Sequence, residues 1–138
     1  MITKATRDDM ARVMACARAF HAYGVWKHVP LDETAFEGFA GALIDGAGVI
    51  LLSDDGFCGG ILSPAYFNPS FVIAAELFWW GEGEGRALRE AFEAWAKDRG
   101  ANAVQFSAMA DDRLPAVSRL YRMAGYQPVE CGFVKEYR

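Results

Sequence analysis

The chain has 138 residues, with 14 Lys and Arg against 18 Asp and Glu, which gives a formal net charge of −4. A chain of this length buries roughly two-thirds of its unfolded surface, and 53% hydrophobic residues supply the core, so the sequence predicts one domain over residues 1–138. A mean hydropathy of +0.05 and a charged fraction of 23% argue against a disordered chain. The acidic balance, with scattered basic residues, argues against a nucleic-acid partner.

Cysteine usage and hydropathy indicate the compartment. The three cysteines Cys16, Cys58 and Cys131 are far apart and form no C-x-x-C pair, so we expect no metal site and a reducing environment. The first residues lack an apolar leader, and the richest apolar stretch, residues 71–80, is short and contains Glu76. The sequence therefore predicts a cytoplasmic protein with no membrane partner.

The first half of the chain predicts two helices between strands. A short strand over residues 2–5 precedes a helix that is capped by Thr6 and ends near Gly24. A second, shorter helix covers residues 32–44. An apolar strand over residues 49–52 then meets an Asp-Gly step, which is a strong hairpin signal.

The next strand begins at Phe57 and carries Gly59-Gly60, which predicts a bulge or a close approach of two backbones. It runs towards Tyr66, and Asn68-Pro69-Ser70 is expected to break it. The longest strand is expected at residues 71–80, and a helix should run from the following glycine loop to Gly100. A strand at residues 103–107 and a helix at about 114–125 come next. Two closing strands are expected at residues 127–130 and 132–137. The order is β-α-α-β-β-β-α-β-α-β-β, an α/β (α+β) class with a largely antiparallel sheet and a helical crossover.

Three glycines, Gly81, Gly83 and Gly85, join the longest predicted strand to its helix. Residues without Cβ let backbone N–H groups converge, and a helix N-terminus adds about half a positive charge, so an anion can bind there. The same glycines also suit any tight turn from strand to helix. The loop lacks the G-K-[ST] of a P-loop and does not follow an early strand, as a dinucleotide-binding motif requires.

Three segments together resemble the GNAT superfamily of acyl-CoA-dependent N-acyltransferases, above all small GNAT-like proteins of phages and bacteria. They are Ala75-Glu-Leu-Phe-Trp-Trp80, Gly81-Glu-Gly-Glu-Gly85-Arg-Ala-Leu88 and Leu120-Tyr-Arg-Met-Ala-Gly-Tyr126. The resemblance implies a GNAT-like mixed sheet flanked by helices, acetyl-CoA as co-substrate, no metal, and a small-molecule or polypeptide amine as acceptor. It leaves a homodimer open.

The family's cofactor contacts carry over to one continuous stretch. The pantetheine of acyl-CoA would pair with the strand backbone, and the diphosphate would bind loop N–H groups, which implies Leu77, Phe78, Trp79, Trp80, Gly81, Gly83, Glu84, Gly85 and Arg86. Trp80 departs from the Arg or Gln of the family, and the loop is short. Carboxylates of Glu82 and Glu84 would cost about a kcal/mol or more if they faced the diphosphate. Ser107 stands where many relatives carry a pantetheine-binding Asn.

Acyl transfer to an amine requires that an ammonium first lose a proton. Glu76 is the one charged residue of its strand, and period-2 alternation predicts that it shares a face with Val72, Ala74, Phe78 and Trp80. Partial burial there would raise its pKa. Similar GNAT enzymes place a catalytic Glu in this strand; the alternative is a structural Glu that is satisfied by a neighbouring backbone group or Arg.

Tyr121 matches the family's Tyr before the Gly-[Phe/Tyr] step, which implies a proton donor to the departing thiolate. The alternative is a core tyrosine, because Leu114, Val117 and Leu120 share its predicted inner face. The aromatic candidates for an acceptor pocket are Trp26, Tyr66, Phe67, Trp79 and Trp80. Two hypotheses stay open: an N-acetyltransferase that works by direct transfer, and a GNAT-like binding or regulatory module without turnover.

Overall fold

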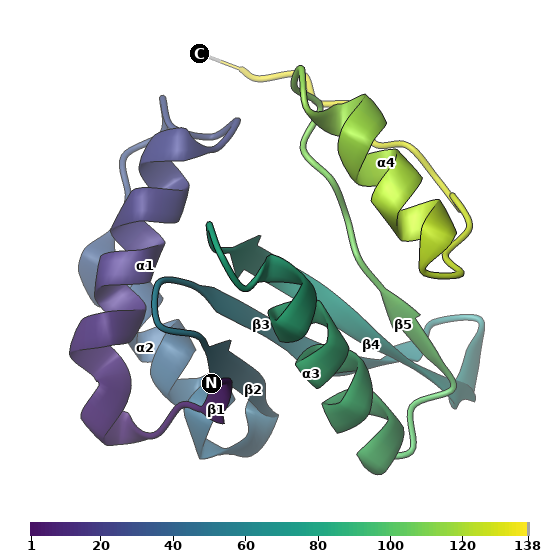
Figure 1. Ribbon diagram of the computed structural model, residues 1–138, viewed down its shortest axis with the longest axis horizontal. Coiled ribbons are helices and arrows are strands. Elements are labelled where there is room, and N and C mark those ends of the chain that lie inside the picture. The colour runs from purple at the N-terminus through teal and green to yellow at the C-terminus, as the bar shows by residue number, and fades with distance from the viewer. Residues whose placement is uncertain (138) are drawn as a thin grey trace. The chain divides into compact units, whose positions relative to one another are not determined.

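A computed structural model describes residues 1–137 and contains a five-stranded sheet (Figure 1). The contacts divide the chain into two units: Met1–Ser107, which holds the whole sheet, and a second unit that starts at Ala108. The single domain expected from the chain length stays a prediction. Within residues 1–137, no helix combines the length and the apolar character needed to cross a membrane.

The strands follow one another in the order β1-β2-β3-β4-β5. Their bounds are β1 Thr3–Lys4, β2 Gly48–Leu52, β3 Phe57–Ala65, β4 Asn68–Trp80 and β5 Ala103–Gln105. The first four pair antiparallel, and β5 joins β4 in parallel. A parallel pair needs a crossover connection, which a helix supplies here, as the sequence predicted.

The helices begin and end close to the predicted residues. They are α1 Met10–Tyr23 after one 3-10 turn, η1 Arg7–Asp9; α2 Glu33–Ala42 with a π-turn, η2 Leu43–Ala47; α3 Gly85–Asp98; and α4 Leu114–Met123. The Asp32 carboxylate accepts a 3.0 Å hydrogen bond from the Ala35 backbone and so caps α2. Gly46 has a φ of 128°, a value that lets the chain leave the helix and enter β2.

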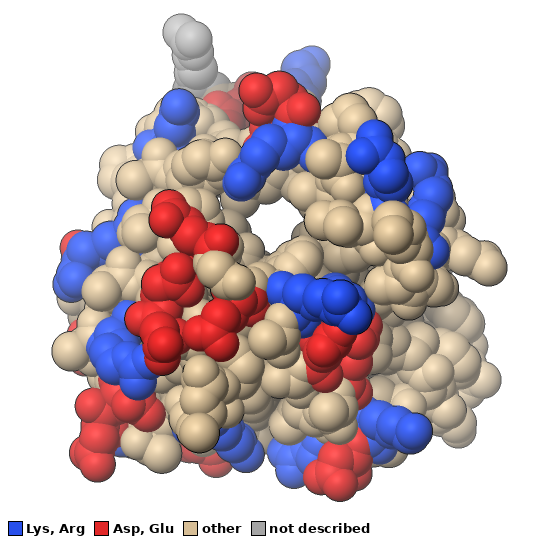
Figure 2. Space-filling model, in the orientation of Figure 1, with Lys and Arg blue, Asp and Glu red and all other residues tan. Residues whose placement is uncertain are grey.

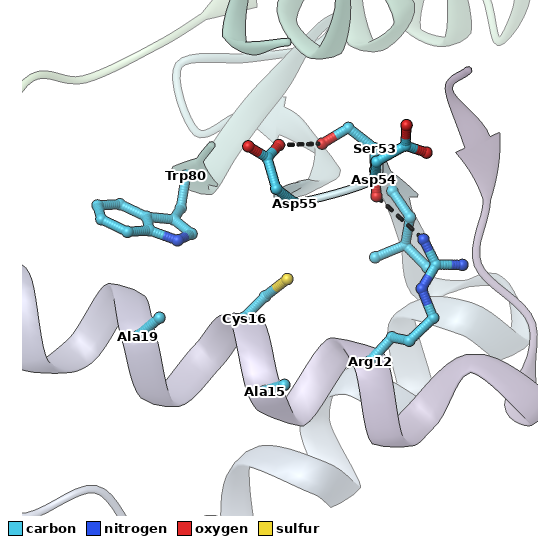
Figure 3. Close-up of a pocket in the computed structure, with 9 residues that line it drawn as sticks. Arg12, Ala15, Cys16, Ala19, Ser53, Asp54, Asp55 and Trp80 are labelled. Atoms are coloured by element: carbon cyan, nitrogen blue, oxygen red, sulfur yellow. Dashed lines mark hydrogen bonds between the residues drawn. The ribbon is translucent and has the colours of Figure 1, made fainter. Parts of the chain in front are cut away.

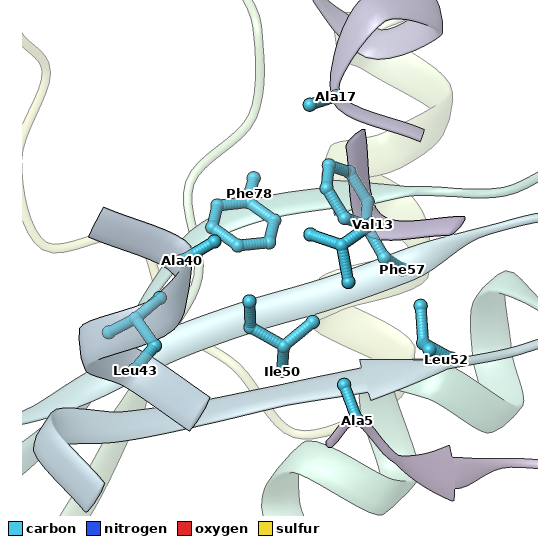
Figure 4. Packing of buried hydrophobic residues seen from close by; sticks show 9 residues of the cluster. All are labelled: Ala5, Val13, Ala17, Ala40, Leu43, Ile50, Leu52, Phe57 and Phe78. Atoms are coloured by element: carbon cyan, nitrogen blue, oxygen red, sulfur yellow. The ribbon is translucent and has the colours of Figure 1, made fainter. Parts of the chain in front are cut away.

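Two hydrophobic clusters cover the two faces of the sheet. On one face, α1 and α2 pack through nine buried residues, shown in Figure 4: Ala5, Val13, Ala17, Ala40, Leu43, Ile50, Leu52, Phe57 and Phe78. On the other face, α3 buries Leu88, Phe92 and Ala96, which recur every four residues along one side of the helix. The sheet is therefore covered on both faces within the first unit.

Two predictions about strands are wrong. Asn68-Pro69-Ser70 begins β4 rather than breaking the chain before it, because Tyr66 and Phe67 alone form the turn of the β3–β4 hairpin. The closing strands at 127–130 and 132–137 are absent, since residues 124–137 contain no strand. Alternating side chains are not sufficient for a strand, which also needs a partner backbone, and an isolated two-stranded ribbon is marginal in water.

The second unit consists of α4 and the segment after it. Leu120, predicted on the inner face of this helix, is 60% exposed, and α4 has no buried residue. The predicted end at Gly125 is confirmed to within two residues, since Gly125 has a φ of 91° just beyond the helix.

Candidate active site at a fork between two strands

The register of β3 against β4 shifts at two points, between Pro64 and Ala65 next to the hairpin turn and between Gly59 and Gly60 in the middle of the pair. Gly59 lies opposite Phe78, and Gly60 lies opposite Glu76, so Leu77 is the extra residue of a β-bulge. The structure therefore confirms the bulge predicted from Gly59-Gly60 and places the inserted residue on the partner strand.

Gly60 is required at the bulge because the two backbones approach closely there. A Cβ at Gly60 would collide with the Ala75 carbonyl oxygen and would lie 2.7 Å from the Phe92 ring of α3. A side chain at position 60 would therefore lie on the face of the sheet that α3 covers. Glu76 is paired with Gly60, so its side chain lies on the same face.

The bulge changes which side chains share a face. Ala74 packs with the α3 cluster, whereas Phe78 packs with the α1 and α2 cluster, 4.4 Å from the Phe57 ring centroid. The prediction that Glu76 shares one face with Ala74, Phe78 and Trp80 is therefore wrong beyond residue 76. Strict alternation fails because the bulge inserts one residue into the period of two.

The pairing of β4 with β5 ends at Ala75, directly before the bulge. The two strands pair only from Ile73 to Ala75 on β4, and in the described chain no strand lies beside the same edge of residues 76–80. Glu76 Oε1 bridges the divergence: it accepts hydrogen bonds from the Ser107 backbone N–H at 3.1 Å and from Ser107 Oγ at 3.2 Å. The two strands and this carboxylate form what we call the fork.

The surroundings of Glu76 set its proton affinity. Burial raises the pKa of the carboxyl group, and the two hydrogen bonds from Ser107 act in the opposite direction without cancelling the rise. A carboxylate with a raised pKa that is held by a neighbour is suited to accept a proton from a bound ligand.

The two tryptophans that follow the bulge point to opposite faces. Trp79 Nε1 donates to the Gly85 carbonyl oxygen at 2.9 Å and thereby holds the start of α3. Trp80 packs against α1, with its ring centroid 5.1 Å from that of Tyr23 and 6.3 Å from that of Phe20. Both side chains pack against helices on the faces of the sheet. The unpaired edge of this part of β4 therefore consists of backbone groups.

The glycine loop fits tightly against the β2–β3 turn. A Cβ at Gly56 would collide with the Trp80 carbonyl oxygen and would lie 2.6 Å from Gly81 Cα. Among the described residues, the backbone N–H groups of residues 83–86 donate no backbone hydrogen bond. These are the free N–H groups of a helix start, which a bound anion can accept.

The acidic side chains around the loop differ in their hydrogen-bond partners and in their distance from the loop. Glu84 accepts from the Met1 ammonium group at 3.3 Å and from the Asp54 backbone N–H at 3.4 Å. Asp55 lies closer to the loop, since a Cβ at Gly83 would be 3.7 Å from its Oδ2. Figure 2 shows that acidic side chains gather on the visible face of the molecule around the β2–β3 turn. The basic side chain of Arg86 pairs with Glu90 at 2.7 Å.

A hollow of about 240 Å³ lies between this turn and α1 (Figure 3). Arg12 spans it and donates to the Ser53 carbonyl oxygen at 3.0 Å, and Ser53 Oγ donates to Asp55 Oδ1 at 3.3 Å. Trp80 closes one end, and Cys16 points into the hollow from α1. These bonds hold the turn in position beside the loop.

The other predicted site residues are placed as follows. Tyr121 lies in the second unit, half-buried on α4, with its ring centroid 5.4 Å from that of Tyr126. Of the aromatic candidates for an acceptor pocket, Trp80 lines the hollow of Figure 3, whereas Tyr66 is 97% exposed at the tip of a hairpin. Sequence reasoning missed the bond between Glu76 and Ser107, which joins residues 31 positions apart and has no local signal.

No protein-family description and no curated protein matches the chain. Solved structures do match. AAC(6')-Iy in complex with the bisubstrate analogue CoA-S-monomethyl-acetylneamine has a TM-score of 0.72 at 13% identity, over 100% of this chain and 97% of that one. The soil-metagenome aminoglycoside acetyltransferase meta-AAC0020 in complex with sisomicin has a TM-score of 0.70 at 16% identity, over 99% and 96% of the two chains.

A Trypanosoma brucei acetyltransferase has a TM-score of 0.67 at 13% identity, over 99% of each chain. The likeness spans the full length of acetyltransferases of the GNAT type. The chain therefore has the GNAT acetyltransferase fold, as the resemblance in the sequence predicted.

Proposed function

We propose that the protein transfers an acetyl group from acetyl-CoA to a primary amine and that Glu76 accepts the proton which the amine must lose. The geometry of the fork is the main support for this proposal. An unpaired strand edge begins at the bulge, and the half-buried carboxylate of Glu76, which has a raised pKa, lies where β4 ceases to pair with β5. Solved structures of similar fold that were determined with CoA or a CoA analogue also support the proposal.

The residues at the fork fit acetyl-CoA in two respects. The edge from Leu77 to Trp80 offers backbone N–H and C=O groups to the amides of a pantetheine arm, in the manner of an added strand. The N–H groups of residues 83–86 at the start of α3 offer donors to a diphosphate. When bound, acetyl-CoA supplies an acetyl group that is activated as a thioester.

Glu76 would act on the amine side of the reaction. An ammonium group has no lone pair, so it must release its proton, either to the carboxylate directly or through one water molecule. The two bonds from Ser107 hold Oε1 in place and leave Oε2 for this task. Ser107 is in this proposal a positioning residue for the base, in addition to the pantetheine contact that the sequence predicted.

Tyr121 would act on the thiol side. A phenol hydroxyl can donate a proton or a hydrogen bond to a departing thiolate, and the resemblance assigns this role to Tyr121. The half-buried position on α4 leaves part of the side chain accessible.

A GNAT-fold binding module without turnover is the second candidate, and the charge beside the loop favours it. Asp55 lies against the glycine loop, and Trp80 occupies a position where the family has Arg or Gln. A carboxylate close to a diphosphate weakens binding by about a kcal/mol at an exposed site.

Thermal unfolding with CoA separates the two candidates. A ligand at 100 times its dissociation constant stabilises a fold by about 2.7 kcal/mol, so CoA should raise the melting temperature by several degrees. A Gly83→Asp variant places a further carboxylate in the loop and should reduce this shift. The matched control is Gly38→Asp, because Gly38 has open space around it on α2. No shift with millimolar CoA would favour the binding module.

A further inference from the structure

A second hollow lies on the face of the sheet that α1 and α2 cover, next to the bulge. We propose that it binds the apolar body of the acceptor, so that the acceptor is a compact primary monoamine with an aromatic or branched aliphatic group. This inference rests on the proposed function and specifies its substrate class.

The lining of the hollow is almost wholly apolar. Of the nine described residues that line it, eight are Ala, Leu or Phe, and His21 is the ninth. Phe57 and Phe78 are buried and form its floor, whereas Phe39, which is 44% exposed, lies at its rim. The volume is about 290 Å³, at the lower end of the range for small-molecule pockets, so a body the size of one aromatic ring suits it.

The hollow is joined to the fork through one residue. Leu77, the inserted residue of the bulge, lines the hollow and directly follows Glu76 along β4. An amine whose apolar body lies under α1 and α2 therefore reaches the strand edge at the bulge. The Glu76 side chain lies on the other face of the sheet at the same unpaired edge, so the amine must extend past Leu77 and around this edge to reach the carboxylate, directly or through one water molecule.

The polarity of the lining excludes acceptors with many charges. Among the described residues, no carboxylate lines the hollow, and each additional ammonium group placed there would lose its hydration without gaining a partner. His21 does not fill this role, because its Nε2 donates to the Val29 carbonyl oxygen at 2.6 Å. Its ring instead holds the segment after α1 against that helix. A polyamine such as the sisomicin bound to meta-AAC0020 therefore does not fit here.

The test compares amines with the full chain and acetyl-CoA, with the acetylated product measured by mass spectrometry. We expect kcat/KM for 2-phenylethylamine to exceed that for ethanolamine by at least about ten-fold, because a buried apolar group of this size is worth at least that factor. Sisomicin should not be acetylated. An equal or higher kcat/KM for sisomicin or ethanolamine would overturn the inference and leave the proposed acetyl transfer intact.

A rim variant tests the location of the binding site. Phe39→Ala should raise KM for 2-phenylethylamine about ten-fold, which is more than it raises KM for ethanolamine, and its partial exposure limits the cost to folding. The matched control is Phe71→Ala, because Phe71 is 39% exposed and lies on β4 outside the hollow. Equal effects of the two substitutions on KM would place the amine elsewhere.

Direct binding keeps this inference separate from the proposed function. If CoA gives no thermal shift, the proposed function fails, and binding of 2-phenylethylamine is then followed by NMR saturation transfer. Binding that Phe39→Ala abolishes and Phe71→Ala retains would support the hollow as an amine site. No binding to the native protein would overturn it.

Discussion

Replacing Glu76 with Gln distinguishes a catalytic role of this carboxylate from a purely structural role. Gln has nearly the same shape, and its carbonyl oxygen still accepts the bonds that Ser107 donates through its backbone N–H and Oγ at 3.1 and 3.2 Å. The substitution therefore removes a proton acceptor without removing the contact that bridges the fork.

The expected loss of rate follows from the role of a general base, which contributes about 10² to 10⁴-fold. Because a free amine is more abundant at high pH, the loss should be greatest at low pH. The acetylation rate of the variant is measured with saturating acetyl-CoA across the pH range, and its affinity for CoA serves as the control.

The stability should change in the opposite direction. The pKa of Glu76 is raised in the folded state, so the fold binds the proton more tightly than the unfolded chain does. This contribution to stability is complete below the unfolded pKa of about 4.3 and is lost as pH rises through the folded pKa. At neutral pH, Glu76→Gln should therefore raise the free energy of unfolding, by about 1.4 kcal/mol for each unit of the pKa rise.

Urea unfolding at several pH values measures this effect. The gain in stability from Glu76→Gln should shrink to nothing as pH falls towards 4.3. Ser107→Ala gives an independent check: it removes one hydrogen bond that lowers the pKa of Glu76, so the acid limb of the rate profile should move to higher pH. An unchanged rate and an unchanged stability slope in Glu76→Gln would refute the reasoning.

Two further changes test the bulge and the second unit. Gly60→Ala should lower the free energy of unfolding by about 1–3 kcal/mol in urea, since its Cβ would overlap the Ala75 carbonyl oxygen; Gly83→Ala, whose nearest neighbour is 3.7 Å away, should change it by less than about 0.5 kcal/mol. Tyr121→Phe should reduce turnover at least about ten-fold and leave the CoA dissociation constant within about two-fold, and the reverse pattern would count against a proton donor.

The parts of the fold that could be predicted from sequence depend on neighbouring residues. The buried face of α3 follows from the spacing of Leu88, Phe92 and Ala96, and the β2–β3 hairpin follows from its Asp-Gly step. In both cases the residues that determine the element lie within it. This is why these elements begin and end close to where they were expected.

The fork depends on pairing between distant segments, which limits prediction. Gly59-Gly60 signals a bulge, but the identity of Leu77 as the inserted residue follows only from the register of β4. The face of Glu76 changes with that one insertion, so the strand pattern alone assigns its neighbours wrongly. Ser107 was predicted as a ligand contact, and only the parallel pairing of β5 brings it to the carboxylate.

The charge at the glycine loop leads to one more prediction. The sequence places the electrostatic cost on Glu82 and Glu84, yet Glu84 bonds to the Met1 ammonium group and the Asp54 backbone, so its charge is partly balanced. Asp55 belongs to another hairpin and lies against Gly83. An acid that the loop sequence does not contain therefore opposes a bound diphosphate in addition to Glu82.

Asp55→Asn should then strengthen CoA binding about five-fold at low ionic strength, which corresponds to about 1 kcal/mol between exposed charges. The Asn side-chain oxygen still accepts from Ser53 Oγ, so the turn should keep its conformation. Calorimetric titration with CoA at low and high salt measures the gain, which should shrink as salt screens the charges. Asp54→Asn is the matched control, because Asp54 contacts the loop through its backbone N–H. If both variants bind CoA like the native protein at low salt, the diphosphate does not lie at this loop.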